Sequence, residues 1–479
     1  MKTNTEIELK LSISRENLKK MLALPLMKKC LHKDTKTVRR LITSYYDTPE
    51  MVLQNNGIAY RVRDKGDGTF EATVKTAKKN VGGVTERLEL NLPLAEDRAE
   101  LEGFKELGLP LELTELAPQG VEKLFTVNVQ RTTYLLYYGA AVIELAIDRG
   151  NILADKAKAP VEEIEFELKE GEVPELLAFA AELAAQVPLF VEMGTKYARG
   201  LELRGLPASA PLPEARLSGS NAQLALLGMV QQSGMELCRL SKQLQKGEDG
   251  AIAAIAYELQ NVKAFLAYAK DGVKLTIEEK LLQGLDAFLE LCGQHANLLL
   301  LMGSWVDLRS YAEDYLDKDV LSPVLEQELQ ECRSRLLEKI NLGQLTALLF
   351  EALSELSQVK EDVSSVKSTL GPCILSWLDA DAVPGDALMH ACRLAAVAKG
   401  KKLGKLFRLL WITLSERELF LEEEGSLTCL STLVRKCNTK KLYAACSLLK
   451  GYVLHEGMMN AYTLKFKELN MQKVYKLLQ

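Results

Sequence analysis

Three charged side chains, Glu6, Glu8 and Lys10, alternate with aliphatic residues in the stretch 5–11. Successive side chains of a β-strand point to opposite faces, so a strand here carries all three charges on one face. Neighbouring carboxylates suit a hard divalent cation that prefers oxygen ligands, and an ammonium beside them can stabilise an anion. The pattern therefore indicates chemistry on a metal-associated anion, unless this face is simply the solvated side of an ordinary strand.

Eight short runs of period two occur in the first 170 residues, and each predicts a strand. They cover residues 5–11, 41–47, 58–64, 70–76, 85–91, 127–134, 141–148 and 161–169. Their charged faces carry a cationic set, Lys10, Arg61, Arg63, Lys75, Arg87 and Arg131, and an anionic set, Glu6, Glu8, Glu89, Glu144, Asp148, Glu165 and Glu167. The opposite faces are largely aliphatic and require burial.

Two arrangements can bury these aliphatic faces. If they meet inside a barrel, the charged faces form a solvated outer skin, which is the usual arrangement for one such strand taken alone. If helices cover them from outside, the charged faces line a polar tunnel. The Arg61/Arg63 and Glu165/Glu167 pairs, and helical patterns with apolar stripes such as 15–27 after the N-cap Ser14, favour the tunnel.

A tunnel with this lining has a defined ligand chemistry. Buried charges are tolerated only if they pair, stay hydrated or bind a charged ligand. Arginine presents a fork of donors to phosphate oxygens, and clustered carboxylates suit Mg²⁺ or Mn²⁺. The interior therefore fits a polyanion with its metal, such as a nucleoside triphosphate, inorganic triphosphate or polyphosphate.

The composition restricts location and partners. A net charge of −5 gives no general basis for binding nucleic acid, so none is expected. The nine cysteines are scattered without a CxxC pair, which is typical of reduced thiols in a cytoplasmic protein. No leader pattern or membrane-length apolar run is present, and four distant histidines argue against a histidine-built zinc site. Oligomeric state is not indicated.

The chain changes character in a proline-rich segment, residues 204–220, which predicts a linker between domains 1–203 and 221–479. Beyond it the hydrophobic period is 3.6, as at Leu403, Leu406 and Leu410. Such patterns cover 221–246, 251–270, 276–302, 324–358, 386–421 and 439–452, which predicts an all-α helical bundle.

Several motifs occur in a fixed order along the N-terminal 200 residues. They are Glu6-Ile7-Glu8-Leu9-Lys10, Tyr45-Tyr46-Asp47-Thr48-Pro49, Ala59-Tyr60-Arg61-Val62-Arg63, Thr73-Val74-Lys75, Arg87-Leu88-Glu89, Asp148-Arg149-Gly150, Glu163-Ile164-Glu165-Phe166-Glu167 and Thr195-Lys196-Tyr197-Ala198-Arg199-Gly200. Together they resemble the CYTH domain, the domain of the triphosphate tunnel metalloenzymes.

The resemblance implies an α+β domain, an eight-stranded antiparallel closed β-tunnel with surrounding helices, that binds triphosphate with Mg²⁺ or Mn²⁺. It assigns phosphate binding to Arg61, Arg63, Lys75, Arg87, Arg131 and Lys196, metal binding to Glu6, Glu8, Glu89, Asp148, Glu165 and Glu167, and catalysis to Lys10, Glu6 and Glu8. The sequence departs from the family pattern at Asn91, where an acid is common, and at Val129, where a basic residue is common. Glu144 and Glu163 are either further ligands or residues of the tunnel rim, and the rim is favoured for both.

The helical half resembles a degenerate CHAD domain, a helical module that many relatives carry after the CYTH domain, and the resemblance implies polyphosphate binding. Tyr257 and Gln260 replace the histidine and arginine of its signature. Lys401, Lys405 and Arg408 share a basic helical face, which is either a polyphosphate site or an ordinary solvated surface.

These features predict a metal-dependent triphosphatase that hydrolyses inorganic triphosphate. Adenylate cyclase and thiamine triphosphatase activities, both known in the family, are alternatives on organic triphosphates. A non-catalytic polyphosphate-binding protein is an alternative of another class. The acid pairs favour an enzyme, because phosphate binding alone does not need clustered carboxylates.

Overall fold

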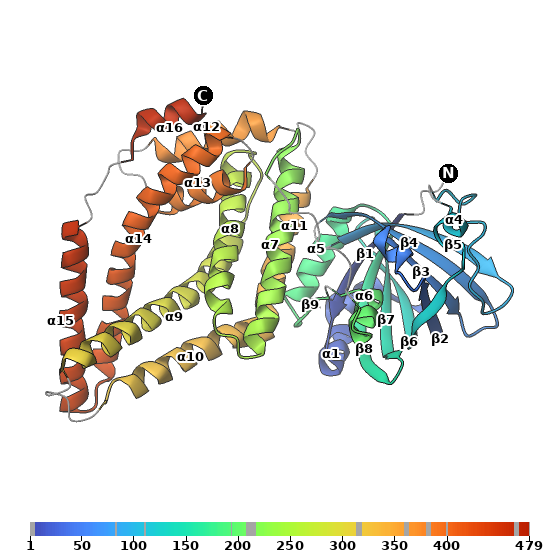
Figure 1. Ribbon diagram of the computed structural model, residues 1–479, viewed down its shortest axis with the longest axis horizontal. Coiled ribbons are helices and arrows are strands. Elements are labelled where there is room, and N and C mark those ends of the chain that lie inside the picture. Colours follow the sequence, from blue (N-terminus) through green and yellow to red (C-terminus); the bar gives the residue numbers. More distant parts are fainter. Residues whose placement is uncertain are drawn as a thin grey trace. The chain divides into compact units, whose positions relative to one another are not determined.

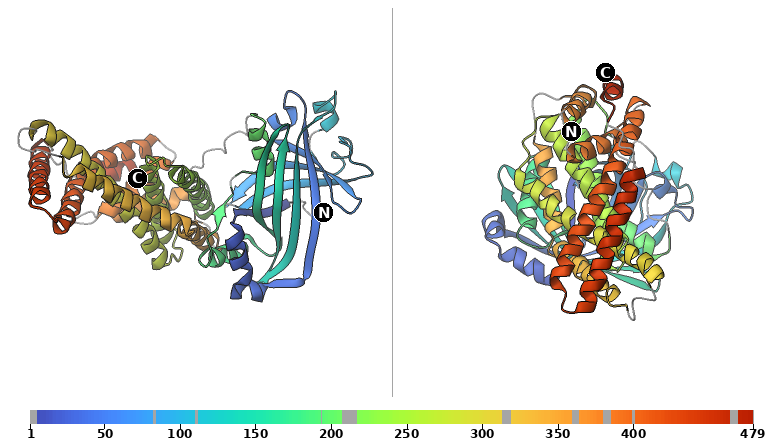
Figure 2. Two further views of the ribbon diagram at one scale, coloured as in Figure 1. Left: turned by 90° about the horizontal axis from the view of Figure 1, so that it is seen from below. Right: turned by 90° about the vertical axis from the view of Figure 1, so that its left-hand side faces the viewer.

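The computed structural model describes residues 5–478 except 82–83, 110–111, 193, 207–216, 313–318, 359–363, 380–384, 399–400 and 464–468, and without the side chains of 5, 77–87, 311–312, 401, 414–424 and 456–463. The chain divides into two compact units, Met1–Glu214 and Ala215–Gln479 (Figures 1 and 2). This division falls within the predicted linker 204–220, most of which lies outside the described residues.

The N-terminal unit contains one antiparallel sheet. Its strands are β1 (Thr5–Ser12), β2 (Leu31–Asp47), β3 (Ile58–Asp64), β4 (Phe70–Val81), β5 (Val84–Leu94), β6 (Glu122–Tyr138), β7 (Ala141–Ala154), β8 (Ala157–Glu170) and β9 (Phe190–Val191). All eight predicted strands are present. Most are longer than predicted, because the period-two pattern marks only the segments with one face fully buried.

The two ends of the sheet meet at β1. The strand order is β5-β4-β3-β2-β6-β7-β8-β1-β9, and β1 also pairs with β5 over Thr5–Glu8. Beyond Glu8, β1 continues along β8 and gains β9 on its other side through Leu11 and Ser12. The prediction of eight strands in a fully closed tunnel is thus corrected: the sheet has nine strands, and its ends join over only four residue pairs.

The aliphatic strand faces point outward and are covered by helices, as predicted. Helices α1 (Arg15–Ala23), α2 (Pro25–Cys30) and α5 (Val173–Ala184) contribute buried side chains, and Phe179 of α5 packs on Phe166 of β8 with ring centroids 5.3 Å apart. On β3–β5, a second buried cluster joins Tyr60 and Val74 to Phe104. Short helices α3 (Val52–Asn55) and α4 (Leu113–Leu116) border that cluster.

The predicted helix 15–27 is two helices. Helix α1 begins after Ser14, whose side chain accepts a hydrogen bond from the Asn17 amide as an N-cap. It ends before Leu24 because that residue precedes Pro25, and a residue before proline avoids the helical region. Pro25 then starts α2.

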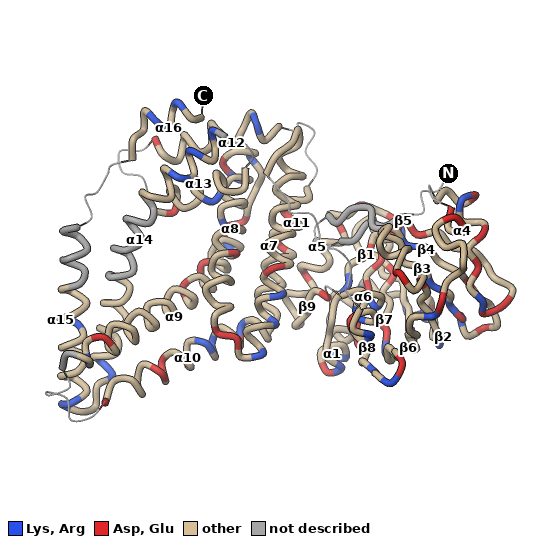
Figure 3. The backbone as a smooth tube through the Cα atoms, in the orientation of Figure 1, with Lys and Arg blue, Asp and Glu red and all other residues tan. Residues whose placement is uncertain are grey.

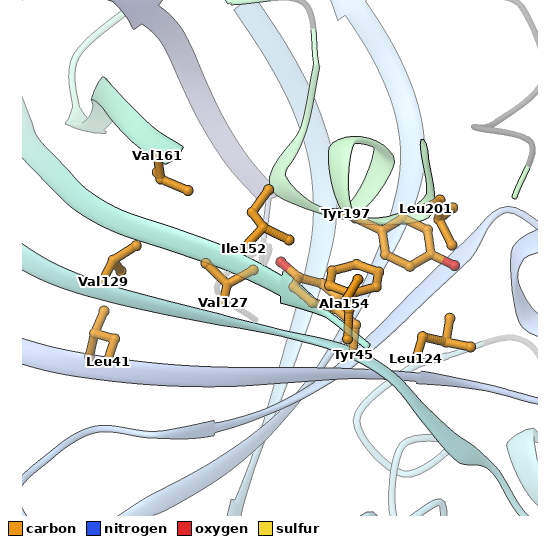
Figure 4. Close-up of a cluster of buried hydrophobic side chains, with 11 residues drawn as sticks. Leu41, Tyr45, Leu124, Val127, Val129, Ile152, Ala154, Val161, Tyr197 and Leu201 are labelled. Atoms are coloured by element: carbon orange, nitrogen blue, oxygen red, sulfur yellow. The ribbon is translucent and has the colours of Figure 1, made fainter. Parts of the chain in front are cut away.

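Part of the barrel interior is apolar, which the sequence did not predict. Tyr45 pairs with Arg61 across β2 and β3, so both side chains lie on the inner face. Tyr45 packs against Phe125 and Tyr197 in a cluster with Val127, Leu201 and others (Figure 4). Tyr197 and Leu201 belong to α6 (Lys196–Leu203), which begins at the N-cap Thr195.

The C-terminal unit is helical within its described residues. Its helices are α7 (Ala222–Gln245), α8 (Ala251–Asp271), α9 (Glu279–Ala312), α10 (Ser322–Asn341), α11 (Gln344–Ser357), α12 (Val366–Leu378), α13 (Gly385–Val397), α14 (Lys401–Lys436), α15 (Lys440–Thr463) and α16 (Met471–Leu478). Gly343, with φ +74°, divides the predicted segment 324–358 into α10 and α11. Helices α12 and α16 were not predicted. No helix of the described chain is long and apolar enough to cross a membrane.

The predicted amphipathic face of α14 is present. Leu406 and Leu410 are fully buried, and Lys405 and Arg408 are exposed. The side chain of Lys401 lies outside the described residues. The role of this basic face stays a prediction.

Gly200 lets α6 seat against the barrel, and its substitution by alanine tests this. An added Cβ would lie 2.2 Å from the Phe125 ring, so Gly200→Ala should lower the free energy of unfolding of the N-terminal unit by about 1–3 kcal/mol. Far-UV circular dichroism should show an earlier transition. The three tryptophans all lie in the helical unit, so their fluorescence should show an unchanged unfolding transition for that unit. Gly228→Ala on α7, where a Cβ meets open space, is the matched control; equal effects would contradict the argument.

Glu355 on α11 should make the helical unit less stable as the pH rises. Burial, with help from Glu351 and Glu278, raises the pKa of Glu355 to about 7 although the Glu278 amide opposes this. A carboxyl with a raised folded-state pKa stabilises the fold below its unfolded pKa and loses that contribution as the pH approaches 7. Glu355→Gln should remove a decline of up to about 3 kcal/mol between pH 4.5 and 7, measured by urea unfolding with tryptophan fluorescence. An identical pH profile in the variant would refute this role.

Candidate functional site

The charged strand faces enclose a cavity of about 470 Å³ inside the N-terminal unit. Charged side chains that line it are Lys10, Arg61, Arg63, Lys75, Arg131, Lys169 and Lys196, with Glu6, Glu8, Glu89, Glu165 and Glu167. Figure 3 shows both signs of charge along these strands. Tyr45 and Tyr197 link this cavity to the interior apolar cluster.

Strand register places the opposite charges beside one another. Glu8 of β1 lies opposite Glu167 of β8, and Lys10 lies opposite Glu165. The Lys10 ammonium is 3.1 Å from Glu165 and 3.4 Å from Glu8. Burial alone would lower the pKa of Lys10, but these two carboxylates outweigh burial and raise it, so the ammonium keeps its charge.

One group of ion pairs joins β1, β3, β4 and β5. Lys75 lies 2.5 Å from Glu6 and 2.7 Å from Glu89, and Arg61 lies 3.3 Å from Glu89. Burial would raise the pKa of Glu89, but Arg61 and Lys75 together lower it. Burial raises the pKa of Glu6 to about 7, with Glu8 and Glu89 adding to the effect and Lys75 opposing it. The positive charge of Lys75 is therefore not enough to offset the effects of burial and of the neighbouring carboxylates on Glu6.

A second group of ion pairs is centred on Lys196 at the start of α6. Its ammonium is 2.8 Å from Asp148, 2.9 Å from Glu165 and also hydrogen-bonded to Glu163. The oxygens of these three carboxylates lie within 4.8 Å of one another, close enough to hold a metal ion. The Lys196 ammonium takes that position among them. Asp148 and Glu165 also bind Arg131, which donates from Nε and a terminal nitrogen to Asp148 at 2.7 and 2.5 Å.

Two arginines of the lining are only partly neutralised by the described residues. Arg63 donates from Nε to the Thr43 hydroxyl at 3.0 Å and forms no ion pair with a described residue. Burial, followed by Arg61 and Arg131, lowers the pKa of Arg63 to about 10. The Nε of Arg61 is buried without a hydrogen-bond partner. A buried donor without an acceptor is costly, so an anion in the cavity would stabilise both side chains.

The carboxylates nearest β1 do not form one of the close carboxylate groups of the described residues. Glu6, Glu8 and Glu167 line the cavity and lie outside the cluster around Lys196. Burial raises the pKa of Glu167, although Lys169 at 2.6 Å opposes this. Carboxylate oxygens are the kind of ligand that Mg²⁺ and Mn²⁺ prefer, and each of these three also has a lysine ammonium nearby.

Most of the sequence-predicted site residues meet at the cavity. They are Glu6, Glu8, Lys10, Arg61, Arg63, Lys75, Glu89, Arg131, Glu165, Glu167 and Lys196. Asp148 lies behind the cavity wall, fully buried against Arg131 and Lys196. Arg87 pairs with Glu6 in the strand register, but its side chain lies outside the described residues.

Two acidic residues were placed at the tunnel rim. Glu144 lies 3.8 Å from Lys169, is partly exposed and does not line the cavity. The placement of Glu163 was wrong: it is 2% exposed and contacts Lys196 and Arg199. The reason is that α6 packs over this part of β8 and brings two cations to Glu163, which the strand pattern alone does not reveal.

Sequence reasoning missed five lining residues, Tyr45, Ala59, Lys169, Thr195 and Tyr197. Lys169 could have been found, because it continues the Glu165 and Glu167 face of β8 by one more step of two. The tyrosines could not, because aromatic side chains give no sign of facing a charged cavity. Nearby Asp47 has a structural role: its carboxylate accepts hydrogen bonds from the Thr48, Leu53 and Gln54 amides.

Comparison with known proteins shows which family the N-terminal unit resembles. Residues 4–201 match the model of the CYTH domain. The chain is 34% identical over 161 residues to an inorganic triphosphatase of Haemophilus influenzae; the match covers 33% of this chain and 44% of that protein, so it spans less than half of the relative.

Solved structures also match part of the chain. One is a putative adenylyl cyclase from Hippeastrum described as having a dominant triphosphatase activity, with 20% identity, 42% of this chain and 96% of that chain covered, and a TM-score of 0.28. Another is a putative adenylate cyclase from Bacillus halodurans, with 18% identity, 41% and 98% coverage, and a TM-score of 0.26.

The CHAD-like character of residues 221–479 stays a prediction. The motifs from Glu6 to Gly200, the sheet that carries them and the family match agree over one region of the chain. Residues 4–201 are a CYTH domain.

Proposed function

We propose that the CYTH unit hydrolyses inorganic triphosphate, with a divalent metal, inside the charged cavity. The observation that carries this proposal is the pair of arginines Arg61 and Arg63: the Nε of Arg61 is buried without a hydrogen-bond partner, and Arg63 forms no ion pair with a described residue. The lining has seven described cationic side chains against five carboxylates, which suits a polyanion. The named activity of the Haemophilus influenzae relative supports the same reaction.

The lining favours a compact inorganic anion over a nucleotide. Apart from charged residues, the cavity is lined by Tyr45, Ala59, Asn91, Thr195 and Tyr197. The Tyr45 ring already packs on Phe125 and Tyr197, with ring centroids 5.0 and 5.4 Å away. Part of its surface is therefore covered and cannot stack on a substrate ring. A base or thiazole ring would have little apolar surface to contact. Inorganic triphosphate therefore fits this lining better than an organic triphosphate does.

Hydrolysis of a phosphoanhydride requires neutralised oxygens, an aligned water and a stabilised leaving group. Arg61, Arg63 and Lys75 would hold substrate oxygens from β3 and β4. Arg131 and Lys196 would do so from the opposite wall, fixed in orientation by Asp148, with Glu163 also holding Lys196. Because these donors are positioned before the substrate binds, little reorganisation is needed during the reaction.

Lys10 would act as a fixed positive charge. Glu165 and Glu8 raise its pKa despite burial, so the ammonium does not release its proton near neutral pH. It would stabilise negative charge that develops on the transferred phosphoryl group. Arg87 is proposed to add a further phosphate contact, from β5.

Glu6, Glu8 and Glu167 would hold the metal ion, with Glu89, Glu165 and Asp148 as further members of the proposed ligand set. Glu165 and Asp148 are engaged by Lys196 and Arg131, so the first three carboxylates are the better candidates. A bound Mg²⁺ or Mn²⁺ supplies charge neutralisation and an activated water.

Substitution of Arg63 tests the phosphate-binding role. Arg63→Gln should lower kcat/KM for tripolyphosphate by about 10²–10³-fold, because a donor without a carboxylate partner is free to act on the substrate. Phosphate release from tripolyphosphate, ATP and thiamine triphosphate should be measured in parallel. Tripolyphosphate should be the preferred substrate.

The matched control is Arg15→Gln, which removes an exposed arginine of α1 that pairs with Glu162. It should leave kcat/KM unchanged. Equal activities of the two variants would exclude Arg63 from the reaction. If the unsubstituted protein hydrolyses none of the three compounds but still binds tripolyphosphate, the result would instead support the non-catalytic alternative.

Metal removal tests the carboxylate site. EDTA should abolish phosphate release and excess Mg²⁺ or Mn²⁺ should restore it. Glu8→Gln should raise the metal concentration for half-maximal activity by on the order of 10–100-fold or more, since even outer-shell substitutions have effects of this size. Glu16→Gln, an exposed carboxylate of α1, serves as the control. Full activity in EDTA after dialysis would refute the metal requirement.

A further inference from the structure

A cleft of about 1160 Å³ lies in the helical unit between α8, α9, α10 and α13. Its walls are mainly apolar and include Ile252, Ala253, Ala256, Leu289, Cys292, Ala296, Leu299, Leu329 and Met389. Cavities of this size and character hold organic ligands when a few polar groups converge inside them. The polar groups in this cleft are therefore informative.

Arg393 of α13 is the most unusual of these groups. It is 8% exposed and lines the cleft, with its guanidinium 3.9 Å from the centroid of the Tyr257 ring. One terminal nitrogen donates to Gln260 at 2.6 Å, and Nε is buried without a partner. Among the described residues, no carboxylate forms an ion pair with Arg393. A buried guanidinium that lacks a counter-ion is costly unless a ligand provides an acceptor.

The other charged groups around the cleft are acidic or already paired. Lys263 lies 2.7 Å from Asp286 and 3.4 Å from Asp386. Asp249 is held at 2.5 Å by Arg333. The cleft is also lined by Glu290 and Glu326.

The two histidines add no positive charge near neutral pH. Burial lowers the pKa of His390 to about 4, and burial also lowers the pKa of His295. Arg393 is then the one cation of the described lining that is not balanced by a carboxylate.

This balance excludes a polyanion. Five carboxylates line the cleft against Lys263 and Arg393, so a chain of phosphates would meet strong repulsion after its first contact. A ligand with one anionic group would pair with Arg393 and bury its remaining surface on the apolar walls. Tyr257 would limit movement of the guanidinium by stacking on it.

We propose that the cleft between α8, α9, α10 and α13 binds an organic ligand that has one anionic group, paired with Arg393, and an apolar body. This site is separate from the proposed triphosphatase reaction and does not depend on it. It also assigns the segment around Tyr257 and Gln260 a ligand chemistry other than polyphosphate.

The test uses the full chain and the probe 1-anilinonaphthalene-8-sulfonate, which has one sulfonate and an apolar body. Trp377 lies next to the cleft, with its ring centroid 5.7 Å from His390, so energy transfer from tryptophan reports probe in the helical unit. Decanoate should displace the probe. Decanol, which lacks the charge, should be about tenfold weaker or more, and tripolyphosphate should not compete.

Two variants locate the site. Arg393→Gln should weaken probe and decanoate binding by about tenfold or more and leave decanol unchanged, because only the charged contact is lost. Ala253→Trp should block the cleft without removing a buried charge, which keeps the test valid if Arg393→Gln fails to fold. The control is Arg239→Gln, an exposed arginine of α7 paired with Glu236.

The outcomes are separable. Loss of binding in both cleft variants but not in the control supports the proposal. Displacement by tripolyphosphate at least as strong as by decanoate would overturn it in favour of a polyanion site. Unchanged probe binding in Ala253→Trp would also overturn it, by placing the probe elsewhere.

Discussion

The N-terminal unit depends on one buried ammonium, that of Lys196, among the carboxylates of Asp148, Glu163 and Glu165. Three neighbouring carboxylates could not remain ionised away from water without a cation between them. The cation comes from α6, whose position depends on the N-cap at Thr195 and on the close approach of Gly200 to Phe125. The apolar cluster and the charged cavity are thus parts of one arrangement, because the first holds the helix that neutralises the second.

That arrangement separates carboxylates that hold the structure from carboxylates that remain available. Asp148 is fully buried and bound to two cations, so its removal would take away one of the carboxylates that orient Arg131 and Lys196. Glu6, in contrast, has a pKa raised to about 7 by burial and by neighbouring acids. A nearby cation favours the ionised form of such a carboxylate, which is why a metal ligand is proposed at Glu6. The same physics that makes Asp148 a support makes Glu6 a ligand candidate.

The sequence predicted the strands and the side on which their charges lie, because period two fixes both when one face is strictly aliphatic. It did not predict that β1 changes partners at Glu8, since pairing depends on strands far apart in the chain. It placed Glu163 at the rim because the cations that bury it come from α6. The inward orientation of Tyr45 and Phe125 was not predicted for a related reason, because it follows from the register between strands in the folded sheet.

One physical criterion supports both proposed sites. Arg63 in the barrel and Arg393 in the helical unit are buried guanidinium groups that no described carboxylate neutralises. Their surroundings differ, and this difference determines the ligand. Around Arg63, further cations make the cavity attractive to several negative charges at once. Around Arg393, acidic residues and apolar walls leave room for one negative charge and a hydrophobic body. The two proposals therefore start from the same feature, an arginine without a carboxylate partner among the described residues, and the residues around it determine which kind of anion is proposed.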